Sequence, residues 1–178
     1  MPLGSPKRKF KRIFLAVDIH GSEITFRKFL GAAKFYDVDA LMMGGDLTAK
    51  TITPIVKQKD GTFTTRLAGG VREHLTEAEL GPIEEAIANS GPYPVRLTQE
   101  EYDALRADPK KVEDLFTQLM IDEIHRWTEM AEKHLAPLGI PLYWIGGNDD
   151  KAEALAYVVS TPHVRYVDEQ VARFDEDH

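Results

Sequence analysis

Residues 12–21, RIFLAVDIHG, and residues 40–46, ALMMGGD, decide the fold of this chain. Each begins as a short run of apolar residues, typical of a strand buried on both faces, and each ends where polar or glycine residues begin. Between them, Ser22 and Glu23 open a stretch with apolar residues at roughly helical spacing, which predicts a helix. Strand, helix and strand in this order form a βαβ unit, so we expect an α/β protein with an open, parallel sheet.

A long helix and a third strand are predicted further along the chain. Apolar residues recur at helical spacing from residue 112 to residue 135, which predicts one long amphipathic helix after Pro109. Residues 142–145 (LYWI) form a third apolar run, and GGNDD follows directly at residues 146–150. We expect a short helix over residues 152–159 after this third strand, and alternating runs beyond it.

The stretch between the second and third strands is longer than a crossover requires. It spans about 100 residues, whereas a βαβ unit takes about 30. We therefore expect one domain over residues 1–178 with an insertion at approximately residues 51–108. Asp60-Gly61 predicts a hairpin in this insertion, and residues 76–88 predict a helix that begins with a capping box. The insertion is either a lid or dimer surface beside the site, or an elaboration of the surface.

Composition excludes several classes of protein. The 178 residues are 43% hydrophobic and 29% charged, which is ordinary for a globular domain. A formal net charge of -7 disfavours general nucleic-acid binding, because an acidic surface repels a phosphate backbone. No run of about 20 apolar residues occurs, so we expect no membrane span. The sequence has no cysteine, which favours a cytoplasmic location and leaves only oxygen and nitrogen ligands for any metal.

Polar residues follow all three predicted strands and carry the candidate chemistry. Asp18 and His20 follow the first strand, Asp46 the second and Asn148 the third. Any one of them alone could simply cap a helix or close a turn. Neighbouring strands lie about 4.8 Å apart, so in a parallel sheet these side chains converge on one volume. A divalent cation would relieve the repulsion between the carboxylates, and these donors suit Mn, Fe or Zn better than calcium.

The motifs Asp18-x-His20, Gly45-Asp46 and Gly147-Asn148 resemble, in order and placement, those of the calcineurin-like metallophosphoesterases. The resemblance implies a four-layer α/β/β/α sandwich, of which this chain is the N-terminal part with an inserted hairpin and helices. It also implies two divalent ions, drawn from Mn, Fe, Zn and Ni, with Mn first. Asp18 and His20 would bind one ion, Asp46 would bridge both, and Asn148 would bind the second.

The implied activity is hydrolysis of phosphate mono- or diesters, with a small phosphate ester or a nucleotide as substrate. Asp149 stands where the family places the histidine that acts as general acid, and Asp150 follows it, so these two are the catalytic candidates. The family's lone His and G-H-x-H motifs do not occur after Asp150. We therefore expect the natural domain to continue past His178. A second chain that supplies the missing ligands is the other way to complete the site.

Two alternative functions stay open at this point. One is a non-catalytic scaffold or protein-binding module that keeps the metallophosphoesterase architecture, and it predicts a large exposed apolar patch. The other is a flavodoxin-like phosphotransfer domain that needs only Asp18, Asp46 and one Mg²⁺. A homo-oligomer is compatible with each of these functions.

Overall fold

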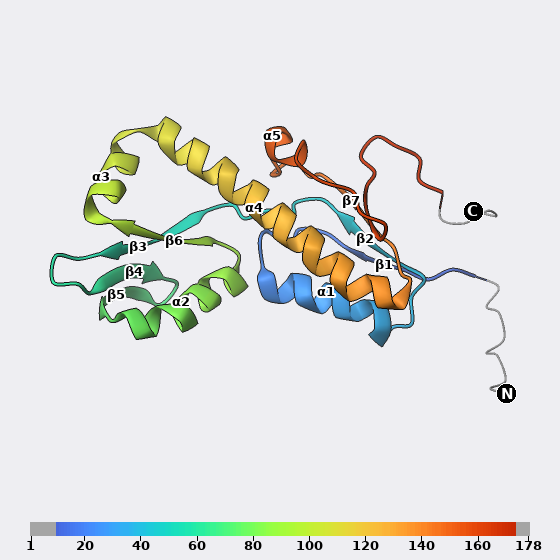
Figure 1. Ribbon diagram of the computed structural model, residues 1–178, viewed down its shortest axis with the longest axis horizontal. Helices are drawn as coiled ribbons and strands as arrows, with labels where there is room; N and C mark the ends of the chain where they lie inside the picture. Colours follow the sequence, from blue (N-terminus) through green and yellow to red (C-terminus); the bar gives the residue numbers. More distant parts are fainter. Residues whose placement is uncertain (1–9, 174–178) are drawn as a thin grey trace.

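The computed structural model describes residues 10–173 and shows an α/β fold with two four-stranded sheets and five α-helices in that range (Figure 1). The α/β class predicted from the sequence is therefore confirmed. Any continuation past His178 lies outside the described residues. None of the helices within residues 10–173 is both long enough and apolar enough to cross a membrane.

The first sheet is parallel throughout, as the βαβ pattern predicts. Its strands, in spatial order, are β1 (Ile13–Ala16), β2 (Ala40–Gly44), β7 (Leu142–Ile145) and β8 (Val164–Tyr166). The register aligns Leu15 with Met42, and Met42 with Tyr143. All four strands run in one direction, so the loops that follow β1, β2 and β7 meet at the same edge.

Two helices cover one face of this sheet. They are α1 (Glu23–Phe35), capped by Ser22, and α4 (Pro109–Leu135), whose first turn is capped by Asp108. Phe26 of α1 and Trp127 of α4 stack with ring centroids 4.2 Å apart and are almost fully buried. They join Met43 and Trp144 of the sheet in the main hydrophobic core.

The opposite face of the first sheet is open along β1. Ile13, Leu15 and Val17 alternate with the core residues of β1 and are 55%, 57% and 49% exposed. Met42 and Ile145 continue this face on β2 and β7 and are half-buried. We call Ile13, Leu15, Val17, Met42 and Ile145 the open face. Parallel sheets are ordinarily covered on both sides, so an open apolar face is unusual.

The second sheet lies within the long stretch between β2 and β7. Its strands, in spatial order, are β5 (Gly70–Leu75), β4 (Phe63–Leu67), β3 (Ile52–Lys57) and β6 (Tyr93–Thr98). Strand β3 pairs with β4 as an antiparallel hairpin and with β6 in parallel. The helices α2 (Glu77–Ser90) and α3 (Gln99–Ala107) accompany this sheet.

The two sheets lie toward opposite ends of an elongated molecule, and α4 leads from the second sheet to the first (Figure 1). The second sheet therefore does not stack on the open face. Helix α4 contributes to both units, because Trp127 packs in the core of the first sheet while Met120 and Ile124 pack around Tyr93 of β6.

Several local predictions from the sequence can be compared with these elements. The hairpin around Asp60-Gly61, the long helix and the strand at residues 142–145 are confirmed. The helix expected over residues 152–159 is shorter, since α5 covers Ala152–Leu155, and the alternating run after residue 164 forms only β8. Strands β5 and β6 and helix α3 were not predicted.

Candidate metal centre

The loops that follow the first two parallel strands are joined by backbone hydrogen bonds. The Asp18 amide donates to the Gly45 carbonyl at 3.1 Å, and the His20 amide donates to the Asp46 carbonyl at 3.0 Å. The Gly21 amide continues the ladder to the Leu47 carbonyl at 2.7 Å. Three successive bonds fix the two loops side by side beyond the ends of the strands. These backbone hydrogen bonds hold the side chains of the two loops facing one another.

Asp18, His20 and Asp46 come together at this edge. One potential ligand atom from each lies within 4.8 Å of the others. The Asp18 side chain is 61% exposed and that of His20 is 28% exposed, whereas Asp46 as a residue is only 9% exposed. His20 Nε2 lies 3.7 Å from Asp18 Oδ1, close enough for attraction but too far for a hydrogen bond. We call these three residues the triad.

All three residues of the triad have a left-handed backbone. Their φ angles are 57° for Asp18, 44° for His20 and 52° for Asp46. A residue with a Cβ atom rarely adopts this region, and holding one there costs about 1–3 kcal/mol. Only three other non-glycine residues among those described have positive φ. Strain gathered in the residues that face one another is typical of a functional site.

Two glycines allow the backbone to approach Asp46 closely. A Cβ atom on Gly147 would lie 2.1 Å from Asp46 Oδ1 and 2.2 Å from its backbone nitrogen. Gly45 has φ +100°, and a Cβ there would lie 2.8 Å from the Gly147 Cα. No other residue type fits at these positions without moving the loops. The glycines bring the loop after β7 against the Asp46 side chain.

Asp150 holds the loops together from inside. Its side chain accepts hydrogen bonds from the backbone amides of Leu47, Thr48 and Gly147 at 2.9–3.1 Å. It also accepts the Thr48 hydroxyl at 2.7 Å, and the residue is 8% exposed. Both carboxylate oxygens are thus committed to the loops after β2 and β7. These contacts show that Asp150 positions the two loops, while the catalytic role expected for it from the sequence stays a prediction.

Asp149 points the other way, towards Lys50. Its carboxylate lies 2.6 Å from Lys50 Nζ, and its backbone amide donates to Asp46 Oδ1 at 3.0 Å. The hydrogen bond from Lys50 lowers the pKa of the Asp149 carboxyl, so this group is a carboxylate near neutral pH. A carboxylate has no proton to donate, and this argues against the general-acid role expected for Asp149.

Asn148 lies at the exposed tip of the same loop. Its Nδ2 donates to Asp149 Oδ1 at 3.1 Å, so the Asp149 carboxylate orients the amide. The amide oxygen is the only metal-binding atom of this side chain. Asn148 is linked to the triad indirectly: its side chain donates to Asp149, and the Asp149 amide donates to Asp46.

The donors of the triad fit a divalent metal ion. Two carboxylates and one imidazole form an oxygen and nitrogen set that suits Mn, Fe or Zn. His20 Nδ1 is buried and has no hydrogen-bond partner, which is costly for a polar atom unless a ligand satisfies it. Lys50 is the nearby cation that sequence reasoning missed. Its place in the same short loop as Asp46 was the signal available.

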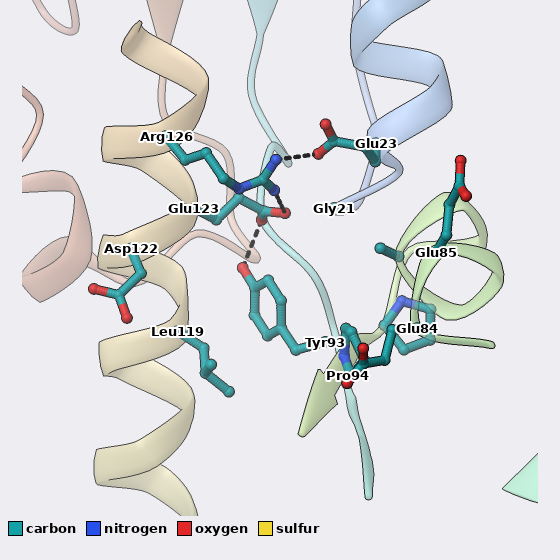
Figure 2. Close-up of a pocket in the computed structure, with 12 residues that line it drawn as sticks. Gly21, Glu23, Glu84, Glu85, Tyr93, Pro94, Leu119, Asp122, Glu123 and Arg126 are labelled. Atoms are coloured by element: carbon teal, nitrogen blue, oxygen red, sulfur yellow. Dashed lines mark hydrogen bonds and ion pairs between the residues drawn. The ribbon is translucent and has the colours of Figure 1, made fainter. Parts of the chain in front are cut away.

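A second group of ionisable residues lies behind the loops that carry the triad. Tyr93 accepts the Ala49 amide at 3.2 Å and donates to Glu123 at 2.6 Å. Arg126 lies between Glu123 and Glu23, as Figure 2 shows. Burial raises the pKa of Glu123 to about 7, which outweighs the lowering by Tyr93 and Arg126. This network anchors the loop that begins at Asp46 to α4 and β6.

The network forms one wall of a hollow of about 420 Å³ between α1, α2 and α4 (Figure 2). Glu84, Glu85 and Asp122 also line this hollow. Burial opposes the ionisation of Glu23, but hydrogen bonds from Trp127 and Arg126 prevail and lower its pKa. Glu23, Glu123 and Arg126, which line this hollow, thus have charged or hydrogen-bonding partners within the protein.

Comparisons with protein-family models, with curated proteins and with solved structures find no match to this chain. The function of the site therefore has to be inferred from its geometry and donor chemistry.

Proposed function

We propose that this chain hydrolyses phosphate mono- or diesters with divalent metal bound at the triad. The observation that carries the proposal is the convergence of Asp18, His20 and Asp46, with one potential ligand atom from each within 4.8 Å of the others. Two carboxylates at this distance repel each other in the absence of a cation. The strained backbone and the unpartnered His20 nitrogen support the same interpretation.

The proposed ligands follow the resemblance to the metallophosphoesterases. Asp18 and His20 would hold one ion, Asp46 would bridge to a second, and the Asn148 amide oxygen would complete the second site. Mn is the first candidate, followed by Fe, Zn and Ni. Bound metal would polarise the phosphoryl group and lower the pKa of water, so that hydroxide is available near neutral pH. We propose the same family's α/β/β/α sandwich as the fold, with this chain as its N-terminal part and with an inserted hairpin and helices.

The other residues of the site have supporting roles in this proposal. Asp150 keeps the Asp46 loop and the Gly147 loop in register, because its two oxygens accept hydrogen bonds from both. Lys50 places a cation where a phosphate oxygen can approach, since its side chain is 53% exposed beside Asp149. The ionised Asp149 points to substrates with good leaving groups, which need no general acid.

The test is metal binding and turnover of the purified chain. We expect Mn²⁺ to bind in isothermal titration calorimetry, and p-nitrophenyl phosphate or bis-p-nitrophenyl phosphate to be hydrolysed when Mn²⁺ is present. Asp46→Ala should lower both Mn²⁺ affinity and kcat at least about 100-fold, because one bridging ligand is lost. Asp103→Ala is the matched control, because Asp103 is an exposed carboxylate on α3. Equal activity in the two variants would refute the proposal.

The open face favours a second candidate function. Ile13, Leu15 and Val17 form the exposed apolar patch that a protein-binding scaffold predicts. A scaffold would show no metal-dependent turnover of any phosphate ester, even with the triad intact. The Mn²⁺ titration and the assay above therefore separate the two functions.

A further inference from the structure

A groove of about 470 Å³ opens beside the metal-binding loops. Lys50, Thr51 and Ile52 form one side, where the chain leaves the loop after β2 and enters β3. The first turns of α4 form the other side, and Lys151 of the loop after β7 also lines it. The groove thus lies where the insertion meets the first sheet, and nothing described above accounts for it.

Lys50 connects this groove to the triad. Its Nζ lies 2.6 Å from Asp149, whose backbone amide donates to Asp46 Oδ1 at 3.0 Å. The negative charges of Asp46 and Asp18 also stabilise the positive charge of Lys50. The groove therefore begins one ion pair away from the triad. One ion pair and one hydrogen bond therefore link the Lys50 end of the groove to Asp46.

The groove is lined by four apolar residues and by four polar or charged ones, among them Glu113. Ile52, Pro109, Val112 and Phe116 line it, and Val112 is 41% exposed. Lys151 has partners of its own within the protein, because it lies 3.3 Å from Glu113 and 3.1 Å from the Thr117 hydroxyl. This pairing offsets the charge of Lys151. Lys50, at the end nearest the triad, is likewise paired, since its Nζ lies 2.6 Å from Asp149, but its side chain stays 53% exposed.

We propose that the groove binds the leaving group of the phosphate ester, and that this leaving group is a phenol or an alkyl-substituted phenol. The proposal rests on the phosphoesterase function proposed above. The half-exposed Lys50, beside Asp149, lies nearest the phosphate end of such a substrate, while Val112 and Phe116 match its apolar body. The apolar side chains favour an aryl phosphate over a phosphorylated sugar, because Ile52, Val112 and Phe116 cannot hydrogen-bond to the hydroxyl groups of a sugar.

The test is a series of substrates that differ in apolar length but hardly in leaving-group acidity. Phenyl, 4-ethylphenyl and 4-butylphenyl phosphate are hydrolysed with Mn²⁺ present, and kcat/KM is measured for each. We expect kcat/KM to rise about three- to four-fold for each methylene that enters the groove. Val112→Asp should abolish this rise, because it places a charge in the apolar wall. Val71→Asp is the matched control, since Val71 is a similarly exposed valine on β5 of the second sheet.

A binding measurement gives a readout that is independent of turnover. The affinity of the protein for phenylphosphonate and 4-butylphenylphosphonate, which are not hydrolysed, is measured by calorimetry with Mn²⁺ present. We expect the butyl compound to bind at least about ten-fold more tightly in the wild type and in Val71→Asp, but not in Val112→Asp. Hydrolysis with equal kcat/KM across the series would overturn the groove and leave the phosphoesterase function standing. No hydrolysis of any ester would overturn both.

Discussion

The second sheet and the loops of the first sheet differ in where their polar groups find hydrogen-bond partners. The helices that accompany the second sheet, α2 and α3, both begin with capping boxes, at Thr76 and Thr98. Asp60 accepts the Thr62 amide within the hairpin turn. Each of these polar groups finds its partner within three residues along the chain.

The loops after β1, β2 and β7 depend on partners far away in the sequence. Asp150 binds amides of residues about 100 positions earlier, and Asp18, His20 and Asp46 keep a left-handed backbone with no glycine. This arrangement costs stability and brings like charges together. The comparison teaches that departures from local preferences are concentrated in the first region, where the proposed chemistry lies, while the second region has one left-handed non-glycine residue, His74 of β5.

The largest effect is expected from a methyl group at the closest approach. Gly147→Ala places a Cβ 2.1 Å from Asp46 Oδ1, so the loop after β7 must move. We expect a loss of about 4 kcal/mol in the free energy of unfolding, and Mn²⁺ affinity at least about 30-fold weaker. Gly69→Ala is the control, because a Cβ there has no neighbour within 4 Å. Urea unfolding and calorimetry measure the two quantities, and a neutral Gly147→Ala would contradict the close packing.

The adjacent aspartates allow the same substitution in two environments. Asp150→Asn turns one accepting oxygen into a donor that faces backbone amides, and it should cost about 3 kcal/mol. Asp149→Asn weakens a partly exposed ion pair with Lys50 and the contact with Asn148, so it should cost clearly less than Asp150→Asn. Urea unfolding at neutral pH measures both. Equal losses would show that the two carboxylates do not have separate roles.

The buried Glu123 predicts a pH dependence of stability. Its pKa is raised from 4.5 to about 7 in the folded protein, so the folded state holds a proton that the unfolded state releases. Stability from this group is therefore present below about pH 4.5 and declines as pH rises to about 7. Glu123→Gln should remove this decline and be more stable than the wild type at pH 8, by about 2 kcal/mol. It keeps an oxygen that can accept from Tyr93.

Urea unfolding at several pH values between 5 and 8 measures this difference. Arg126, Glu23 and Tyr93 surround Glu123 in both proteins, so their own contributions should largely cancel in the comparison. Parallel curves for wild type and Glu123→Gln would show that Glu123 does not titrate in this range.

The smallest effect is expected in the second sheet. Thr98→Ala removes the hydroxyl that accepts the Glu101 amide at the start of α3. The loss should be about 1 kcal/mol, with no change in Mn²⁺ affinity, because the capping box is a local feature. A change in metal binding would indicate that the two regions are coupled.

Much of the fold could be predicted from the sequence, because its signals are local. The βαβ unit, the hairpin and α4 follow from hydrophobic period and turn residues. Strand β6 was missed because its sequence, YPVRLT, contains a proline, and its parallel partner β3 lies about 40 residues earlier in the chain. Strand β5 was missed because GVREHL has no apolar alternation.

The candidate site likewise has features that could be predicted from local sequence signals and features that could not. The residues at the strand ends could be named from the sequence, because a parallel sheet brings those ends together. The different orientations of Asp149 and Asp150 could not, since the two have the same chemistry and only the direction of the Leu47 and Thr48 amides separates them. Lys50 was missed because its partner, Asp149, is about 100 positions away.

The open face of the first sheet determines how readily the purified protein self-associates. Hydrophobic attraction strengthens with sulfate or phosphate salts and weakens on cooling. The protein should therefore self-associate in warm, salt-rich buffer and disperse when chilled at low salt. Leu15→Lys should reduce this self-association, because the new cation lies on the open face of the edge strand β1, away from the core and from the loops that carry the triad.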